Sequence, residues 1–388
     1  MNIEIIDSLD QISPVHWNAL VKDNNPFVRH EFLAALEHHG CVGEKFGWLP
    51  RHVLVYDESE LVGAMPLYEK YNNYGEFVFD NAWANAYQQQ GMDYYPKLVS
   101  SIPYTPASGQ RLLAKAGRED EIFPALISVA VQLAEQLECS SVHWLFALAE
   151  EQDFMEAQGL INRHDCQFHW RNFGYQQFDD FLATFSSKKR KNIKQERRKV
   201  SESGVTLRVL DGHTASAADW QHFAFFYTNT FETKWGTPTM NEGFFREVAE
   251  KIPEQVVLVM ADLNGECIAG SLMYRGENTL FGRHWGCTEY VDNLHFEACY
   301  YQGIEYCIEH GLAVFEPGAQ GEHKVPRGFI PTQTRSAHYL VSEKFRQPVR
   351  QHTLHEQRAV AHYMESVREH MPYRADFIAE HLGLPCNL

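Results

Sequence analysis

Apolar and polar positions follow a pattern that occurs twice along the chain. Residues 53–68, VLVYDESELVGAMPLY, contain an apolar run, a polar turn and a second apolar run that ends in Tyr68. Residues 257–274, VLVMADLNGECIAGSLMY, repeat this design about 200 residues later. Short apolar runs bounded by turn residues are typical of strands. Each stretch is therefore predicted to form a β-hairpin.

The segments that follow the two hairpins also correspond. An aromatic-rich segment comes next in each half and is predicted to be a third strand; these are residues 74–83, YGEFVFDNAW, and 279–287, TLFGRHWGC. Amphipathic helices are expected at 120–139 and 295–311, each followed by a short strand, at 141–147 and 313–319. This order predicts two copies of one mixed α/β unit. Two unrelated α/β domains sharing the pattern by chance are the alternative.

The helix expected at 295–311 carries Gly303 near its middle. A glycine there costs about 1 kcal/mol relative to alanine. Close approach of another backbone or of a ligand would explain it, and so would simple packing of the helix on a sheet. Both interpretations stay open.

A strongly basic segment separates the two halves. Residues 186–204, SSKKRKNIKQERRKVSESG, hold eight lysines and arginines, with Glu196 as the acidic residue among them. Ser186 and Ser187 are good helix N-caps, and Gly204 suits the position after a helix end. Ile193 and Val200 would lie opposite the basic arc. We expect one short helix that docks by this narrow apolar edge.

The chain as a whole is acidic, with 34 basic and 51 acidic residues and a net charge of −17. A solvated helix face, a membrane-surface helix and a phosphate-binding face are the three interpretations of the basic segment. The apolar edge lacks Trp, Phe and Leu, which disfavours the membrane. The acidic remainder argues against broad nucleic-acid binding and favours contact with one anionic ligand. Lys191, Lys194 and Arg198 are the candidate residues for binding the phosphates of a donor.

Composition excludes several classes of protein. The length of 388 residues suits two domains, and 44% hydrophobic residues suit a folded chain. The start lacks the features of a secretory signal, and no apolar run approaches the length of a bilayer span. The eight cysteines are scattered, without a CxxC pair, which indicates reduced thiols and a cytoplasmic protein. Histidine spacing matches no zinc motif, so we expect no metal site.

The densest group of polar residues lies in the second half, at 315–336, FEPGAQGEHKVPRGFIPTQTRS. A strand that opens into such a loop commonly brings side chains to a ligand at the sheet edge. Amide formation needs a proton acceptor near the amine and donors near the carbonyl oxygen. The candidate catalytic residues are Glu316, His284 and Tyr300, and the candidate substrate-binding residues are Arg283, Trp285, Glu322, His323, Lys324 and Arg327. A structural salt bridge or cap is the alternative for each one.

Motifs for other chemistries are missing from the sequence. It has no G-x-S-x-G, no phosphate-binding G-x-x-x-x-G-K-[ST] and no G-x-G-x-x-G after a strand. A hydrolase, a kinase and a dehydrogenase therefore lack support.

Several segments resemble the Fem-type transferases. The stretch KNIKQERRKVSESGV is similar to the opening of their second domain. NPFVRHEFLAALEHHGCVG, LVGAMPLY, FHWRNFGY and EPGAQGEHKVPRGF look like the bacterial FemAB-like proteins described as predicted N-acyltransferases. The resemblance spans nearly the whole chain. In it, Glu316 matches the family's acidic residue beside the substrate, and Lys324 and Arg327 match its basic residues before a G-F pair.

The resemblance implies two tandem GNAT-like domains of mixed α/β type and transfer of an acyl or aminoacyl group to an amine. In Fem proteins the donor is aminoacyl-tRNA and the acceptor a peptidoglycan precursor. This chain lacks the [Q/R]-x-x-G-x-[G/A] signature of acetyl-CoA enzymes and the long helical arm of some Fem proteins. The donor, aminoacyl-tRNA or acyl-CoA, therefore stays open.

The sequence thus predicts a first GNAT-like domain at 1–175, a second at 176–345 and a helical segment at 346–388 that packs on the first domain. The expected function is N-acyl or aminoacyl transfer in the cytoplasm, with peptidoglycan precursor or related metabolism as its setting. The expected partners are a donor, an amine acceptor and a tRNA contact, with no tightly bound cofactor. The alternative is a non-catalytic module that recognises a peptidoglycan precursor or a nucleotide-linked ligand. The oligomeric state stays open.

Overall fold

The computed structural model describes residues 1–233, 236–319 and 321–382. The chain forms two compact units, one of residues 1–166 and 333–362 and the other of residues 167–332 and 363–388. The chain passes from one unit to the other within strand β9 (Ile161–Arg171), within strand β15 (Ile330–Leu340) and within helix α12 (Glu343–Arg368). Each unit is therefore built from separate stretches of sequence.

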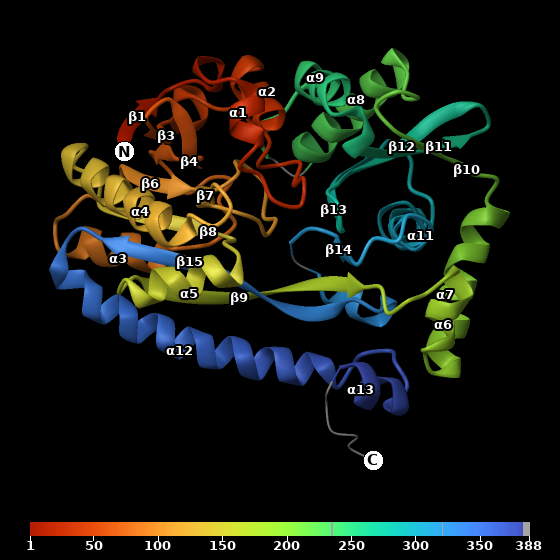
Figure 1. The fold of residues 1–388 in the computed structure, drawn as a ribbon. Helices are drawn as coiled ribbons and strands as arrows, with labels where there is room; N and C mark the ends of the chain where they lie inside the picture. The colour runs from red at the N-terminus through yellow and green to blue at the C-terminus, as the bar shows by residue number, and fades with distance from the viewer. Residues whose placement is uncertain (234–235, 320, 383–388) are drawn as a thin grey trace. The chain divides into compact units, whose positions relative to one another are not determined.

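The first unit contains two sheets (Figure 1). The first sheet is antiparallel, with the order β1 (Asn2–Ile6), β3 (His52–Asp57), β4 (Glu60–Met65) and β7 (Leu113–Ala114). In the second, the end of β15 pairs with β8 (Ser141–Leu145), followed by β6 (Lys97–Ser100), β5 (Tyr68–Lys70) and β2 (Trp48–Pro50), and β6 runs parallel to β8. The helices are α1 (Pro14–Asn18), α2 (His30–His38), α3 (Asn81–Gln89), α4 (Glu119–Gln136), α5 (Ala149–Ala157) and most of α12.

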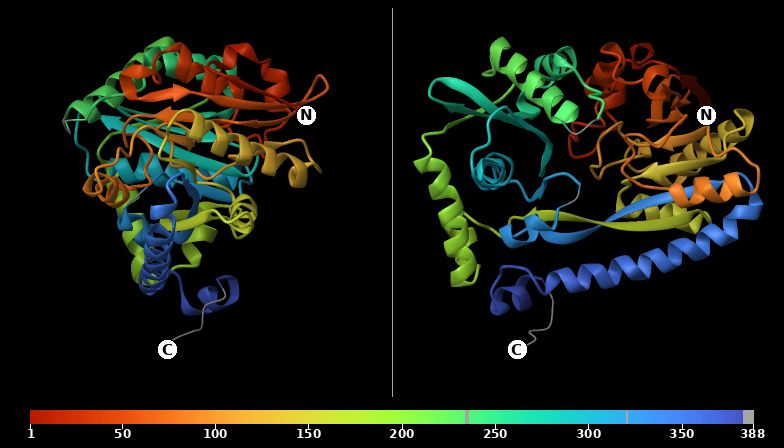
Figure 2. Two further views of the ribbon diagram at one scale, coloured as in Figure 1. Left: turned by 90° about the vertical axis from the view of Figure 1, so that its left-hand side faces the viewer. Right: turned by 180° about the vertical axis from the view of Figure 1, so that it is seen from behind.

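The second unit is built on one sheet. Its order is β10 (Thr206–Leu210), β11 (Val256–Leu263), β12 (Glu266–Arg275), β13 (Thr279–Cys287), β14 (Val314–Glu316) and the end of β9. Helices α8 (Ala217–Thr233) and α9 (Glu242–Lys251) lie on one side of strands β11 to β13, and α11 (Gln302–Glu309) lies on the other (Figures 1 and 2). The remaining helices are α6 (Phe178–Ala183), α7 (Ser187–Glu202), α10 (Leu294–Phe296) and α13 (Ala375–His381), with a π-helical turn at Glu297–Tyr301.

The predicted fold class, a mixed α/β protein with two copies of one unit and a C-terminal helical segment, is confirmed. The strand order β1, β3, β4, β7 in the first unit corresponds to β10, β11, β12, β13 in the second. Both predicted hairpins form, as β3–β4 and as β11–β12, and each contains a register shift near its turn. A helix and a short strand then follow in each unit, α4 and β8 in the first and α11 and β14 in the second.

One predicted strand is wrong. Residues 74–83 form turns and the start of α3, and the two-residue strand β7 occupies the corresponding position in the sheet. The tendency of Asn72 and Gly75 to form a turn outweighs the strand tendency of the aromatic residues in this segment. The Asn72 side chain accepts a hydrogen bond from the Tyr74 amide at 3.0 Å, and Gly75 has a φ of +83°.

Gly303 is explained by packing. A Cβ atom at this position would lie 2.5 Å from the Phe315 ring of β14. The helix can therefore approach the sheet closely only with glycine here, and no ligand is needed to explain the residue.

The predicted domain boundaries remain a prediction. The two compact units are not consecutive in sequence, because 333–362 belong with the first and 363–388 with the second. No helix in the described part of the chain is both long enough and apolar enough to cross a bilayer. Among the described residues no group of three or more metal-binding side chains gathers.

Candidate functional site

The candidate site lies where the parallel strands β13 and β14 stop pairing. The register pairs Thr279 with Val314 and ends with Phe281 opposite Glu316. After Glu316 the chain turns through Pro317 and Gly318, whose φ is +91°. The carboxyl ends of parallel strands are where α/β proteins commonly bind ligands. Glu316, predicted as the proton acceptor, is therefore at such a position.

Glu316 is buried and faces a histidine of the neighbouring strand. Strand β14 pairs with β9, which places Phe315 opposite Trp170. The Nδ1 atom of His169 lies 3.9 Å from Oε1 of Glu316. Burial lowers the pKa of His169 to about 3, with Arg171 and Lys324 adding to the effect. The imidazole is therefore neutral at physiological pH and does not neutralise the carboxylate.

Arg283 approaches the same carboxylate from β13. The β12–β13 register shifts between Leu272 and Met273, which leaves Arg283 at the irregularity. Burial lowers the pKa of the Arg283 guanidinium to about 10, and Tyr274, Tyr227 and Glu316 act in the opposite direction. An arginine with this pKa still carries its charge at pH 7. Arg283 is thus a cation within electrostatic reach of Glu316.

Lys324 holds the turn that follows Glu316. Its ammonium group is buried and donates to the carbonyl oxygens of Gly318 at 2.7 Å and Ala319 at 3.4 Å. Burial lowers the pKa of Lys324 to about 8, and Cys299 opposes this shift. The geometry fits a lysine that positions the loop. The predicted contact of Lys324 with substrate stays a prediction.

Tyr300 and His323 form a second group beside this turn. The Tyr300 oxygen lies 2.8 Å from Nε2 of His323, and the Phe296 ring stacks on Tyr300. Burial raises the pKa of Tyr300, so its hydroxyl stays protonated. Burial, together with Lys324 and Arg327, lowers the pKa of His323. Tyr300 lies in the π-helical turn, a feature that is frequent at functional sites.

Arg327 has internal partners. Its Nη2 and Nε atoms donate to the Glu196 carboxylate at 2.8 and 3.2 Å, and its Nη1 donates to the His323 carbonyl oxygen at 2.6 Å. The guanidinium also lies 3.4 Å from the centroid of the Phe296 ring. These contacts use most of its donors inside the unit. The predicted role of Arg327 in neutralising a substrate therefore has little geometric support.

The other predicted residues are distributed around the sheet. The His284 ring contacts Tyr227 of α8 and Phe245 of α9, whereas Trp285 contacts His295 on the side of α10. Alternation along a strand explains why these neighbours face opposite sides. His284 is therefore on the other side of the sheet from Tyr300. Glu322 is exposed and accepts a hydrogen bond from Tyr363.

The predicted basic helix exists as α7, with Ser186 at its N-cap and Gly204 just beyond its end at a φ of +82°. Ile193 and Val200 are buried, as expected. Arg197 forms ion pairs with Glu297 at 2.9 Å and Glu305 at 2.8 Å. Part of the positive charge thus fastens α7 to the helix that carries Tyr300.

The candidate donor-binding residues on α7 are more exposed. Lys194 pairs with Asp179 and Arg198 with Glu202, in both cases between side chains that are more than half exposed. Lys191 is exposed, and the described residues provide no ion-pair partner for it or for Lys188, Lys189 and Arg190. The first turns of α7 therefore present uncompensated positive charge.

Two residues of the site are not predicted by the sequence. His169 belongs to the stretch Gln167 to Arg171, in which polar residues alternate with Phe168 and Trp170. That alternation signals a strand with one polar face, but it does not reveal Glu316 as the neighbour. Glu196 is visible as the acid within the basic segment, and no sequence signal connects it to Arg327.

Comparison with solved structures supports the fold. The crystal structure of FemX matches with a TM-score of 0.55 and 11% identity, over 90% of this chain and 100% of that one. The C-terminal domain of a putative lysylphosphatidylglycerol synthetase from Agrobacterium fabrum matches at 0.52 and 9% identity, over 83% of this chain and 90% of that one. The L-PGS structure from Bacillus licheniformis matches at 0.51 and 12% identity, over 88% and 96%. At these identities the likeness shows the fold alone.

No curated protein sequence matches this chain significantly. The model of the FemAB-like family, described as peptidoglycan biosynthesis/recognition, matches residues 8–375. A match of this extent shows the family, whose description covers peptidoglycan biosynthesis and recognition. The chain belongs to the FemAB-like family.

Proposed function

We propose that this protein is an N-acyltransferase that moves an acyl or aminoacyl group onto an amine of a peptidoglycan precursor or a related molecule. The observation that carries the proposal is the position of Glu316. Its carboxylate stands at the carboxyl end of a parallel strand pair, beside the neutral His169 and within reach of the Arg283 charge. Family membership and the FemX-like fold support this proposal.

In the proposed reaction the amine nitrogen attacks the carbonyl carbon of the donor. The new C–N bond forms while the C–O bond of an ester donor, or the C–S bond of a thioester donor, breaks. Glu316 takes the proton that the nitrogen loses, and the leaving oxygen or sulfur receives a proton in turn. The Tyr300 hydroxyl, protonated and held by His323, is the candidate donor to the carbonyl oxygen in the tetrahedral state.

The proposed donor carries phosphates, as an aminoacyl-tRNA or an acyl-CoA does. The exposed cations of α7 support this, since the first turns of the helix bear four consecutive basic residues, 188–191. A polyanion would meet uncompensated charge there. Lys191, Lys194 and Arg198 remain the proposed contacts.

The test of the proposal is Glu316→Gln in the full chain. Wild-type protein is incubated with an amine-bearing precursor peptide and either acetyl-CoA or aminoacyl-tRNA, and loss of donor is followed by mass spectrometry. Removing a general base should lower turnover by at least about 100-fold. Glu309→Gln, an exposed carboxylate on α11, is the matched control and should keep wild-type turnover.

Near-normal turnover of Glu316→Gln would show that Glu316 is not the base. A second candidate function is recognition without catalysis, which the family description also covers. The internal hydrogen bonds of Lys324 and Arg327 favour it, because they leave few free cations at this place for a reacting substrate. Binding of the precursor peptide without consumption of any donor would establish that function instead.

A further inference from the structure

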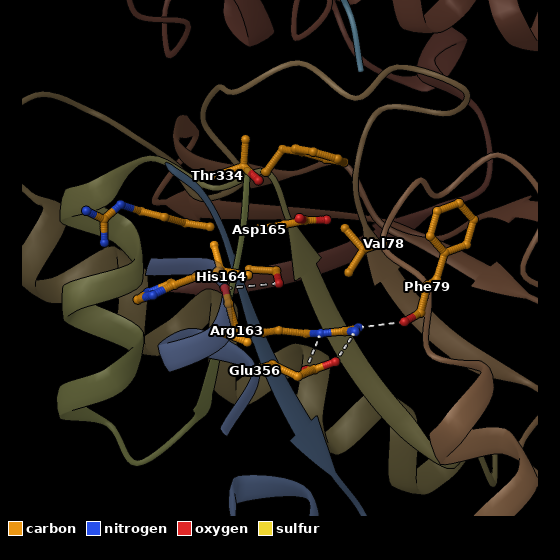
Figure 3. Close-up of a pocket in the computed structure, with 12 residues that line it drawn as sticks. Val78, Phe79, Arg163, His164, Asp165, Thr334 and Glu356 are labelled. Carbon is orange, nitrogen blue, oxygen red and sulfur yellow. Dashed lines mark hydrogen bonds and ion pairs between the residues drawn. The ribbon is translucent and has the colours of Figure 1, made fainter. Parts of the chain in front are cut away.

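The first unit contains a cavity that the proposed reaction does not use. Its volume is about 210 Å³ (Figure 3). Strands β9 and β15, helix α12, the residue after β8 and the loop before α3 all contribute to its walls. The lining residues include Phe79, Phe146, Arg163, Asp165, Thr334 and Glu356.

The Gln152 side chain bonds to both strand β9 and strand β15 beside the cavity. Gln152 of α5 is fully buried, and its Nε2 atom donates to the carbonyl oxygens of Arg163 at 3.3 Å and Ser336 at 2.9 Å. Its Oε1 atom accepts from Arg335 at 2.9 Å. Gln152 thus satisfies backbone groups of both strands. Arg335 is directed toward α5, and by strand alternation Thr334 and Ser336 lie on the other face.

Arg163 is part of the wall and is already neutralised. Its Nε and Nη2 atoms donate to the two carboxylate oxygens of Glu356 at 2.9 and 2.8 Å, and Nη1 donates to the Phe79 carbonyl oxygen at 2.7 Å (Figure 3). Such a two-pronged pair fixes both side chains and cancels their charges. Arg163 therefore does not make the cavity a site for anions.

Two polar groups remain available to a ligand. Thr334 is 4% exposed, and its hydroxyl has no hydrogen-bond partner within the described residues. Asp165 is exposed, and its carboxylate accepts only from the neighbouring Cys166 amide at 2.7 Å among the described contacts. Figure 3 shows this carboxylate directed toward Val78 and the loop of Phe79. The Thr334 hydroxyl therefore borders the cavity and is available to bond a ligand.

The remaining wall is apolar and locally strained. Val78, Phe79, Phe146, Ala359 and Val360 line it. Phe146 directly follows β8 and has a φ of +57°, an unfavourable conformation for a residue with a side chain. Strain of this kind persists where the surroundings impose it, and it clusters at binding sites.

We propose that this cavity binds a small primary ammonium ion carrying a short apolar chain, such as the end of a lysine side chain. The Asp165 carboxylate pairs with the ammonium group, the Thr334 hydroxyl accepts one of its hydrogens, and the aromatic and aliphatic wall covers the methylene groups. An anion is disfavoured, because the Arg163 charge is paired with Glu356 and the Arg335 guanidinium is bonded to Gln152 on the α5 side, which leaves the Asp165 carboxylate to face the cavity. This site is independent of the proposed transfer at Glu316.

The experiment is calorimetric titration of the full chain with pentylamine. Pentan-1-ol and pentanoate, which share its chain, are the neutral and anionic comparisons. Pentylamine should bind at least about tenfold more tightly than either, as expected for a charge-assisted contact. Asp165→Asn should lower the affinity for pentylamine by at least about tenfold and leave the affinity for pentan-1-ol unchanged. Thr334→Val should lower the affinity for pentylamine by a smaller factor.

Asp93→Asn is the matched control, because Asp93 is exposed in the same unit and does not line the cavity. Asp165 is also exposed, so its replacement should leave the unfolding temperature unchanged. Equal affinity for amine and alcohol, tighter binding of pentanoate, or an Asp165→Asn protein that binds pentylamine like the wild type would each overturn the proposal.

Discussion

Lys97 of β6 carries a fully buried charge in the first unit. Its ammonium group is fully buried and donates to Glu76 at 2.8 Å and to Asp80, and Asp80 also accepts from Tyr94 at 2.6 Å. Burial alone would lower the pKa of Lys97, but Glu76 and Asp80 outweigh it and raise the pKa above its usual value. The lysine therefore stays charged, and both carboxylates depend on it.

Replacing Lys97 by methionine keeps the length of the side chain and removes its charge. The two carboxylates would then be buried without their partner, and we expect a loss of about 3–5 kcal/mol in the free energy of unfolding. Urea denaturation measures the change. Lys115→Met is the control, because its pair with Glu60 is exposed, and it should cost at most about 1 kcal/mol. Equal effects of the two substitutions would contradict this assignment.

At the scale of the element, the charged residues of helix α7 form two sets, one paired within the second unit and one exposed to solvent. Glu196 and Arg197 face the rest of the second unit, where they pair with Arg327, Glu297 and Glu305. Lys191, Lys194 and Arg198 face solvent. The first set should therefore determine stability, and the second set should determine affinity for phosphates.

Substituting glutamine for Lys191, Lys194 and Arg198 together should reduce binding of a polyanion such as tRNA. The slope of log affinity against log salt should flatten by about one unit for each phosphate that the helix no longer neutralises. Binding measured across a salt series tests this. Stability should hardly change, since exposed ion pairs contribute little. Unchanged affinity together with lower stability would mean that these cations serve the fold.

Arg197→Gln is the complementary change on the same helix. It leaves the Glu297 carboxylate, which is buried, without its bidentate partner. We expect a loss of at least about 2 kcal/mol in unfolding free energy, since hydrogen bonds to charged groups are the stronger kind. Urea denaturation is the measurement, and a stability equal to that of the wild type would show that α7 docks by Ile193 and Val200 alone.

For the molecule as a whole, buried histidines should set the response to acid. His143 and His338 are both buried, and their Nδ1 atoms lie 2.5 Å apart. Their Nε2 atoms contact the hydroxyls of Ser141 at 2.7 Å and Ser336 at 2.9 Å. Burial, with Lys97 and Arg163 nearby, lowers the pKa of each ring well below 6.5. Asp80 acts against the shift at His338.

The sign of the pH effect follows from these lowered pKa values. Below about pH 6.5 the unfolded chain binds protons at these histidines and the folded chain does not, so stability falls as the pH falls. Each ring contributes a slope of up to about 1.4 kcal/mol per pH unit. Unfolding measured from pH 7.5 to pH 5 should show this loss. His338→Gln removes one of these proton-binding groups. It should lower the slope of unfolding free energy against pH by up to about 1.4 kcal/mol per pH unit, and an unaltered slope would contradict the assignment.

The candidate site was predictable from the sequence only in part. Glu316, Arg283 and Lys324 were expected together, and the structure brings them around one turn because strand ends and loops carry recognisable local signals. His284 was expected with them, but alternation along β13 turns it toward α8. His169 and Glu196 come from β9 and α7, and their contacts depend on how distant segments pair.

The sequence by itself determined the elements whose causes are local. Apolar periodicity, turn residues and caps specify the two hairpins, the basic helix and the repeated order of strands and helices. Only the tertiary structure decided which distant groups meet, because such contacts depend on register and packing rather than on neighbours in the chain. The turn chemistry at Gly75 replaced an expected strand, Gly303 was explained by Phe315, and the cavity at Asp165 is assembled from five separate stretches of the chain.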